Sequence, residues 1–245
     1  MEAEGEILKN AIGAAQILLS ECTLLFDAEG MSIGGIDETK AAMVKVKMAA
    51  AAFKEYDVKP PLAITLYMSE LWKILKKVSS KSIVNMDYDD KQRVLKVKIK
   101  DGYESRYNLK TLETKTVQLP KLNIKTDWVG KLVSKHFSDA VKDIAGYTNE
   151  IKFTGEKERL VLYGMGDKVD IEKIFYKGGE STLSIEHNSS NPVISHYGAE
   201  YLTQMMDAAV SDIFIFGFGN TQPAYINFTV PAKLKVEYWL APRLK

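Results

Sequence analysis

The stretch SELWKILKKVSSKSIVNMDYDDKQRVLKVKIKDGYESRYNL, residues 69–109, decides the fold. Its apolar residues first recur every three or four positions, which predicts an amphipathic helix over Glu70–Ser79 with Ser69 as its N-cap. Short runs with apolar and polar residues in alternation follow, which predict strands at Ile83–Asp87, Val94–Ile99 and Ser105–Leu109. The stretch therefore predicts one helix followed by three antiparallel strands.

The same order recurs about 126–130 residues further along the chain, which indicates an internal repeat. Helical spacing over Ala199–Val210 is followed by predicted strands at Ile213–Phe218, Ala224–Val230 and Lys235–Leu240. Each half also opens on a predicted helix, at Ile7–Ser20 and at Lys131–Ala145. Short predicted strands lie between the two helices of each half: Thr23–Phe26, Met31–Ile36, Ala42–Met48 and Leu62–Tyr67 in the first, and Ile151–Phe153, Leu160–Tyr163, Val169–Tyr176 and Thr182–Glu186 in the second.

The two halves are joined by a linker. Thr111–Lys125 contains Pro120 and shows no sustained period, so we expect domains at residues 1–110 and 126–245 with a connecting loop at 111–125. Each half is expected to be α+β, with two helices covering antiparallel sheets of about eight or nine short strands. Free edge strands could pair with further copies head to tail, a contact that closes into a ring when the rotation allows.

Composition excludes several classes of protein. The chain has 33 Lys plus Arg against 32 Asp plus Glu, so bulk charge does not indicate tight nucleic-acid binding. Cys22 has no partner for an intramolecular disulfide, which favours a reducing compartment. No run approaches the roughly 20 apolar residues of a membrane span. We therefore expect a soluble, cytoplasmic protein.

No constellation for catalysis or metal binding is visible. His136, His187 and His196 are not spaced with other ligands as a zinc site requires. Gly164-Met165-Gly166 and Gly217-Phe218-Gly219 lack the rest of a phosphate-loop pattern and are interpreted as turns. We expect no cofactor, no metal and no enzymatic activity, with a hydrolase that uses His187 or His196 as the remaining catalytic alternative.

Three motifs resemble the archaeal and eukaryotic proliferating cell nuclear antigen (PCNA) family, the DNA sliding clamps. Gly30–Asp37 (GMSIGGID), which runs into Lys40–Val44, is similar to a first-domain motif of that family. Glu200-Tyr201-Leu202, preceded by Ser195-His196-Tyr197, is similar to the entry of a second-domain helix. The most specific motif is Tyr238–Arg243 (YWLAPR), close to the family ending "Y-Y-L-A-P-R/K". The resemblance extends over essentially the full chain.

The resemblance implies a clamp subunit of two topologically similar domains. Three subunits would form a pseudo-sixfold ring, with the helices inside and the sheets outside, and duplex DNA would pass through the hole. The DNA-facing residues implied are Lys73, Lys76, Lys77, Lys81, Lys131, Lys135 and Lys142. Asp139 and Asp207 depart from the pattern, because relatives usually carry basic residues at those helix positions.

The resemblance also implies partners. A clamp loader would place the ring on DNA, and DNA polymerase, flap endonuclease and DNA ligase would dock through short PIP-box-like motifs. The pocket for such peptides would consist of Ile36, Lys40, Ala41, Met43, Val117, Leu119, Pro120, Ile124, Pro223, Tyr238, Trp239, Leu240, Ala241 and Pro242. From pattern alone, the interpretation of Met43, Tyr238 and Leu240 as core residues is favoured, because apolar stripes are usually core.

The subunit interface implied by the resemblance pairs one strand of each domain. Its residues would be Ser105, Arg106, Tyr107 and Leu109 on one copy and Val169, Ile171, Lys173 and Phe175 on the next. Charges there would select which copies pair. Homotrimer and heterotrimer both stay open, as does a scaffold of the same fold that does not bind DNA.

Overall fold

The computed structural model describes residues 1–58, 61–114, 119–120, 122 and 124–244. The chain divides into two compact units. The first consists of Met1–Pro120 together with Thr229–Val236, and the second of Lys121–Phe228 together with Glu237–Lys245. The break at Pro120 lies within the predicted linker. Residues 229–236 include the turn between the last two strands, and they belong to the first unit. The residues just before and just after them belong to the second unit.

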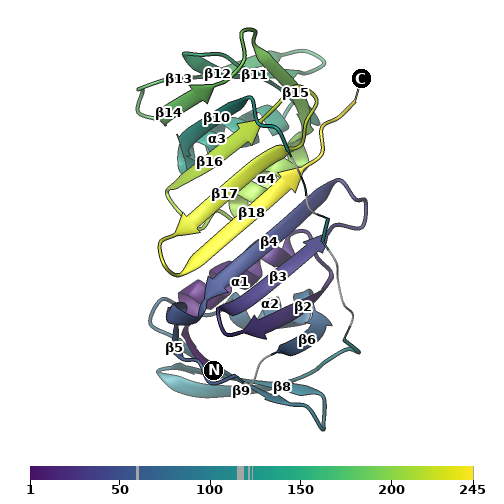
Figure 1. Cartoon of the computed structure of the whole chain (residues 1–245), viewed down its shortest axis with the longest axis vertical. Helices are drawn as coiled ribbons and strands as arrows, with labels where there is room; N and C mark the ends of the chain where they lie inside the picture. Colours follow the sequence, from purple (N-terminus) through teal and green to yellow (C-terminus); the bar gives the residue numbers. More distant parts are fainter. Residues whose placement is uncertain (59–60, 115–118, 121, 123, 245) are drawn as a thin grey trace. The chain divides into compact units, whose positions relative to one another are not determined.

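Each unit is built from the same succession of elements (Figure 1). The first unit contains β1 (Glu2–Glu4), α1 (Gly5–Gln16), β2 (Glu21–Asp27), β3 (Gly30–Ile36), β4 (Ala42–Ala49), the 3-10 helix η1 (Ala50–Ala52), β5 (Phe53–Glu55), β6 (Leu62–Tyr67), α2 (Met68–Leu75), β7 (Ile83–Asp89), β8 (Val94–Asp101) and β9 (Tyr103–Lys110). The second half contains β10 (Trp128–Val133), α3 (Ser134–Ala145), β11 (Glu150–Gly155), β12 (Arg159–Met165), β13 (Asp170–Tyr176), β14 (Thr182–His187), β15 (Val193–Gly198), α4 (Ala199–Asp207), β16 (Ile213–Phe218), β17 (Ala224–Val230) and β18 (Leu234–Leu240). The predicted repeat of element order is confirmed.

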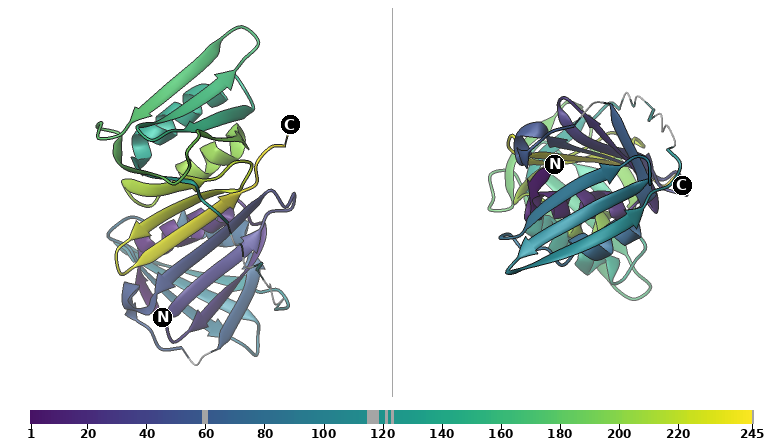
Figure 2. Two further views of the ribbon diagram at one scale, coloured as in Figure 1. Left: turned by 45° about the horizontal axis from the view of Figure 1, so that its top comes forward. Right: turned by 90° about the horizontal axis from the view of Figure 1, so that it is seen from below.

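The sheets repeat as well. In the first unit the strand orders are β5-β1-β7-β8-β9 and β4-β3-β2-β6, and the equivalent orders β14-β10-β16-β17-β18 and β13-β12-β11-β15 occur in the second half of the chain. Helix α1 packs on β4 of one sheet and on β1 and β7 of the other, and α3 likewise contacts β10, β11 and β12. Figure 2 shows the first unit's helices packed against its strands. The apolar stripe of each helix thus closes the core of its unit.

All four predicted helices differ from the observed helices at one or both ends. Helix α2 begins after Tyr67, so Ser69 lies inside the helix and is not its N-cap, and the helix ends at Leu75 rather than Ser79. Residues 131–133 belong to strand β10, because α3 begins at Ser134. Helix α1 ends at Gln16 and α4 at Asp207, both shorter than predicted.

An aromatic cluster forms the core of the second unit. The Phe137 ring of α3 lies 5.1 Å from Phe214, 5.3 Å from Phe216 and 5.8 Å from Phe175, centroid to centroid. Phe137 is fully buried. Contacts of this kind add to the burial of apolar area, which is the main source of stability. The cluster therefore anchors α3 to strands of both sheets.

Cys22 lies in the core of the first unit, and we expect it to be inert in the native protein. Burial raises the pKa of its thiol to about 12, which leaves on the order of a thousandfold less reactive thiolate at pH 8 than an ordinary cysteine has. The unfolded chain releases this proton near the ordinary pKa and the folded chain does not, so this thiol's contribution to stability falls as pH rises above the ordinary value. Alkylation with iodoacetamide at pH 8, followed by mass spectrometry, should label the native chain only as fast as it unfolds. Rapid labelling of fully folded protein would contradict the buried placement.

Candidate functional surfaces

The predicted DNA-facing lysines of the first unit lie at one end of α2. Lys73 is on the helix, Lys76 is its C-cap residue, and Lys77 and Lys81 lie in the turn that follows. All four are exposed. The Lys73 ammonium lies 2.7 Å from the Glu70 carboxylate, one turn earlier on the same helix.

The turn after α2 is held by a carboxylate from β8. Ser79 and Ser82 donate hydroxyl hydrogen bonds of 2.9 Å and 2.5 Å to Asp101 Oδ2. These two bonds, with a smaller contribution from Lys81, hold the pKa of Asp101 below its usual range. The Lys9 ammonium of α1 also donates to the Val78 carbonyl over 3.2 Å. The turn is therefore fixed to the rest of the unit rather than loosely attached.

The lysines of the second unit are placed differently. Lys131 is on strand β10, so the prediction that it lies on a helix is wrong. Lys135 and Lys142 are on α3. Lys142 Nζ lies 2.6 Å from Asp207 Oδ1 of α4, and Lys135 Nζ lies 3.7 Å from Asp139 Oδ2. The two aspartates that depart from the family pattern thus pair with the two helical lysines.

The part of the predicted peptide surface in the first unit surrounds the β3–β4 loop. Asp37 accepts hydrogen bonds from the Thr39 and Ala42 amides, which fixes the loop that carries Lys40 and Ala41. Ile36 is 40% exposed at the end of β3, whereas Met43 is buried in the core.

Leu119 and Pro120 come from the linker. The Leu119 side chain lies against Gly34 of β3, where a methyl group on residue 34 would come within 2.4 Å of Leu119 Cδ1 and would require the leucine to shift. Pro120 is exposed, and Val117 lies outside the described residues. The linker is therefore attached to the sheet through Leu119.

The part of the predicted peptide surface in the second unit divides between core and surface. Tyr238 and Leu240 of β18 are buried, so they are core residues, as Met43 is in the first unit. Trp239 points to the other face, where its ring lies 5.5 Å from that of Tyr225. The Tyr225 hydroxyl donates to Glu237 over 2.7 Å, and burial together with this carboxylate raises the pKa of Tyr225. The remaining half-buried positions are Ile124, Pro223, Ala241 and Pro242.

The predicted interface residues lie on two edge strands. In the described part of the chain, β9 has β8 as its only strand neighbour and β13 has only β12. On β9, Ser105, Tyr107 and Leu109 share the buried side of the sheet, and Arg106 points to the exposed side and binds Glu104 at 2.6 Å.

The residues of β13 alternate in the same way. Ile171, Lys173 and Phe175 share the side that faces α3, where Lys173 Nζ lies 2.5 Å from Asp143. Phe175 is buried against Phe137, so it is a core residue rather than an exposed contact. Val169 precedes the strand and is 45% exposed.

A third edge, that of β4, is already covered within the first unit. Residues 234–236 of β18 lie along β4, and the Ala49 amide donates to the Lys233 carbonyl over 3.0 Å. Lys233 Nζ also lies 3.1 Å from Glu4. In the repeat, β4 is the equivalent of β13, and β18 is the equivalent of β9.

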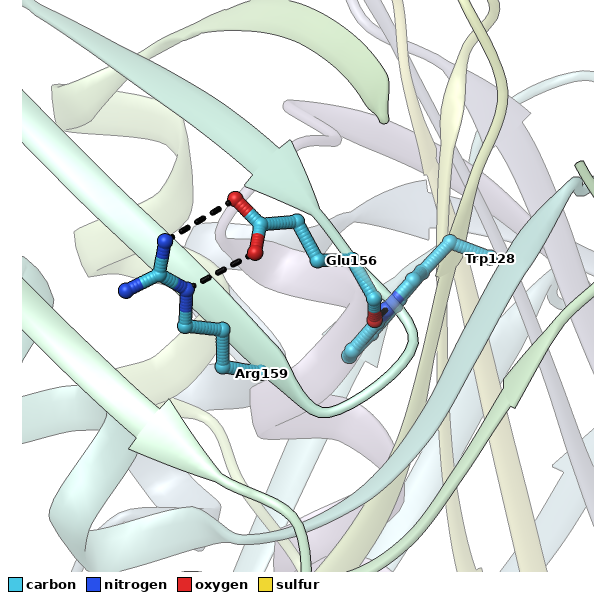
Figure 3. Close-up of polar contacts among 3 residues, drawn as sticks. All are labelled: Trp128, Glu156 and Arg159. Carbon is cyan, nitrogen blue, oxygen red and sulfur yellow. Dashed lines mark hydrogen bonds and ion pairs between the residues drawn. The ribbon is translucent and has the colours of Figure 1, made fainter. Parts of the chain in front are cut away.

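Sequence reasoning missed the polar contacts at the β11–β12 turn (Figure 3). Arg159 donates through Nε and Nη2 to the two carboxylate oxygens of Glu156, over 2.8 Å and 3.2 Å, and Trp128 Nε1 donates to the Glu156 carbonyl over 3.0 Å. The bidentate contact with Arg159 lowers the pKa of Glu156. The spacing of Glu156 and Arg159 across a turn could have indicated their ion pair. Nothing in the sequence indicates that Trp128 contacts the same turn.

Two of the three histidines make side-chain contacts, whereas Nε2 of His187 is buried without a hydrogen-bond partner among the described residues. His196 Nδ1 lies 2.9 Å from Glu150 Oε1, and His136 Nδ1 lies 2.8 Å from Ser181 Oγ. No group of three or more His, Cys, Asp or Glu side chains is arranged to hold a metal ion in the part of the chain that is described. In the same residues, none of the helices has the length and apolar character needed to cross a membrane.

The duplicated arrangement of paired helices on antiparallel sheets is the DNA-clamp fold. Two solved structures match it over 99% of both chains with TM-scores of 0.89: PCNA from Thermococcus kodakaraensis, 19% identical, and a PCNA2–PCNA3 complex from Sulfolobus tokodaii, 21% identical. The family model described as "Proliferating cell nuclear antigen, N-terminal domain" matches residues 2–126. The chain therefore belongs to the PCNA family, as the motifs indicated.

Relatives in sequence extend the match to both halves. The chain is 25% identical to DNA polymerase sliding clamp 1 of Pyrobaculum aerophilum, over 96% of this chain and 93% of the relative. It is 27% identical to DNA polymerase sliding clamp 1 of Sulfurisphaera tokodaii, over 97% and 96%. Sliding clamps are non-enzymatic scaffold proteins, which confirms the prediction that the chain is not an enzyme.

Proposed function

We propose that this chain is one subunit of a DNA sliding clamp, a ring that encircles duplex DNA and tethers replication and repair proteins to it. The observation that carries this proposal is the duplicated clamp fold, shared over nearly the whole chain with relatives that are named DNA polymerase sliding clamps. Weak contacts to phosphate suit such a protein, because they do not depend on the DNA sequence. The closed ring itself would keep the protein on the DNA, so tight binding is not needed. The near-zero net charge is then no objection.

The internal repeat supports a ring closed through β9 and β13. The edge of β4 is covered by residues 234–236 of β18, whereas their equivalents β13 and β9 have open edges in the described chain. A head-to-tail contact of β9 with β13 of a further copy would repeat the same pairing, and repetition of a heterologous contact closes a ring. Three two-unit subunits would then form it.

The side-chain patterns of the two edges are compatible with this pairing. Tyr107 and Leu109 on the buried side of β9 would continue the apolar layer of Ile171 on β13. On the exposed side, Arg106 and Lys110 would approach Asp170 and Glu172. Opposite charges across neighbouring strands favour pairing and select the partner.

The docking of partner proteins is the finer part of the proposal. Ile36 and Leu119 in the first unit, and Trp239 and Pro242 in the second, offer accessible apolar surface to a short peptide with an apolar plug. Clamp loader, polymerase, flap endonuclease and ligase are the partners that this family role implies. The protein would then act with the chromosome.

Mass and topology together test the proposal. Light scattering at several concentrations should give about three times the chain mass of 27.5 kDa, either alone or after mixing with related clamp subunits from the same source. A ring placed on nicked circular DNA should stay bound and should leave when the circle is cut into a linear duplex. A chain that stays monomeric in every mixture, or that leaves circles and linear duplexes equally fast, would contradict the clamp function.

A further inference from the structure

The helix layers of the two units carry opposite charge. In the first unit, α1 and the segment from α2 through its following turn (residues 5–16 and 68–81) contain five lysines against two glutamates. The equivalent residues of the second unit (134–145 and 199–212) contain two lysines against five acids. The five acids are Asp139, Asp143, Glu200, Asp207 and Asp212.

Ion pairing leaves free lysines in the first unit but none on the helices of the second unit. Both lysines of the second unit's helices are engaged: Lys142 binds Asp207 at 2.6 Å and Lys135 approaches Asp139 at 3.7 Å. Lys173 of β13 also pairs with Asp143, so Glu200 and Asp212 are the two of these five acids that stay without a lysine among the described residues. In the first unit, Lys73 pairs with Glu70, whereas Lys76 and Lys77 are exposed and make no ion pair with any described residue. Free cationic charge is therefore concentrated at the end of α2.

We infer that duplex DNA is contacted through the end of α2 and its following turn in the first unit, while the helices of the second unit present an acidic face to it. The inference rests on the proposed function and narrows it to one half of the subunit. Binding to a free cation releases the counterions condensed on a phosphate, whereas the surplus carboxylates of Glu200 on α4 and Asp212 after it repel the phosphate. The helices of each subunit would then hold DNA at one place, and Lys135 and Lys142 of the second unit would contribute little.

The fixed turn supports this assignment. Asp101, Ser79 and Ser82 hold the turn from which the exposed side chains of Lys77 and Lys81 extend. A rigid base with flexible cationic ends makes contacts to phosphate that shift easily along the duplex. Such contacts position the DNA without stopping it.

The test compares matched pairs of charge removals in the trimeric protein. Binding of a linear duplex of about 30 base pairs, whose open ends let it enter the ring, is measured by fluorescence anisotropy at several salt concentrations. Lys76→Gln with Lys77→Gln should weaken binding about tenfold at low salt and reduce the slope of log K against log salt by about 0.9 for each phosphate that is no longer neutralised. Lys135→Gln with Lys142→Gln should leave the slope unchanged, as should the control Lys91→Gln in the β7–β8 turn.

A second comparison separates the effect of charge on DNA binding from any effect of a disturbed structure. Lys142→Gln and Asp207→Asn break the same ion pair between α3 and α4, so a structural effect would be common to both. Only the charge effect differs, and Asp207→Asn should tighten DNA binding.

Equal losses of affinity from the two lysine pairs, or weaker binding by Asp207→Asn, would overturn the inference while leaving the clamp function standing. Light scattering on each variant confirms that the trimer persists. A wild-type protein that forms no trimer and binds no duplex, alone or mixed with related clamp subunits, would overturn the proposed function, and this inference with it.

Discussion

Replacing Ile171 with aspartate is expected to convert the ring into single subunits of 27.5 kDa. Ile171 is half-buried on the side of β13 that faces α3, next to the open edge of that strand. In the isolated subunit the aspartate can reach water, so the fold should persist. In the proposed ring it would face Tyr107 and Leu109 of the next copy, and an unpaired charge buried at an interface costs several kcal/mol.

Light scattering measures this change directly, and thermal unfolding shows whether the subunit is intact. The matched control is Leu183→Asp, an exposed aliphatic residue on β14, which is also an edge strand of the second unit. The control should keep the mass of the wild type. If Ile171→Asp also keeps it, β13 is not part of the ring contact.

Replacing Phe137 with alanine is expected to cause the largest loss of stability, about 3–5 kcal/mol. Phe137 is fully buried, and its ring contacts Phe153, Phe175, Phe214 and Phe216. Removal of the ring would leave a cavity between α3 and both sheets of its unit, and strands on all sides limit how far the cavity can collapse.

Urea unfolding measures this loss, and it is best done in the Ile171→Asp background, because a monomer's stability does not depend on protein concentration. Tyr147→Ala is the matched control, since this ring is 55% exposed just beyond α3 and should change stability by no more than about 0.5 kcal/mol. A loss of less than about 1 kcal/mol for Phe137→Ala would contradict the central place of this ring in the core.

Longer elements with a clear period were predictable from the sequence, and short ones defined by distant partners were not. Strand β8 alternates over eight residues and was predicted nearly to its ends. Strand β1 has three residues, too few to show a period, and exists because it pairs with β5 and β7. Lys131 was assigned to a helix because β10 runs directly into α3 without a proline or glycine to mark the boundary.

The elements that carry the predicted site residues were partly predictable from the sequence, but the contacts of these residues were not. The resemblance located the lysines of α2 and α3, and the structure finds most of them exposed on those elements. The pairing of Lys142 with Asp207 joins residues 65 apart in sequence, and no local pattern indicates such a contact. Tyr238 and Trp239 are neighbours in one motif, yet alternation along β18 sends the first into the core and the second to the surface.

The grouping of residues 229–236 with the first unit has a consequence for synthesis on the ribosome. The strand segment that covers the edge of β4 emerges among the last residues of the chain, after nearly all of the second half has been translated. A nascent first unit therefore keeps a strand edge uncovered for most of its translation, and uncovered edges recruit strands from other chains. Chains that terminate early, before β18, would carry that exposed edge permanently and would be targets for aggregation and degradation.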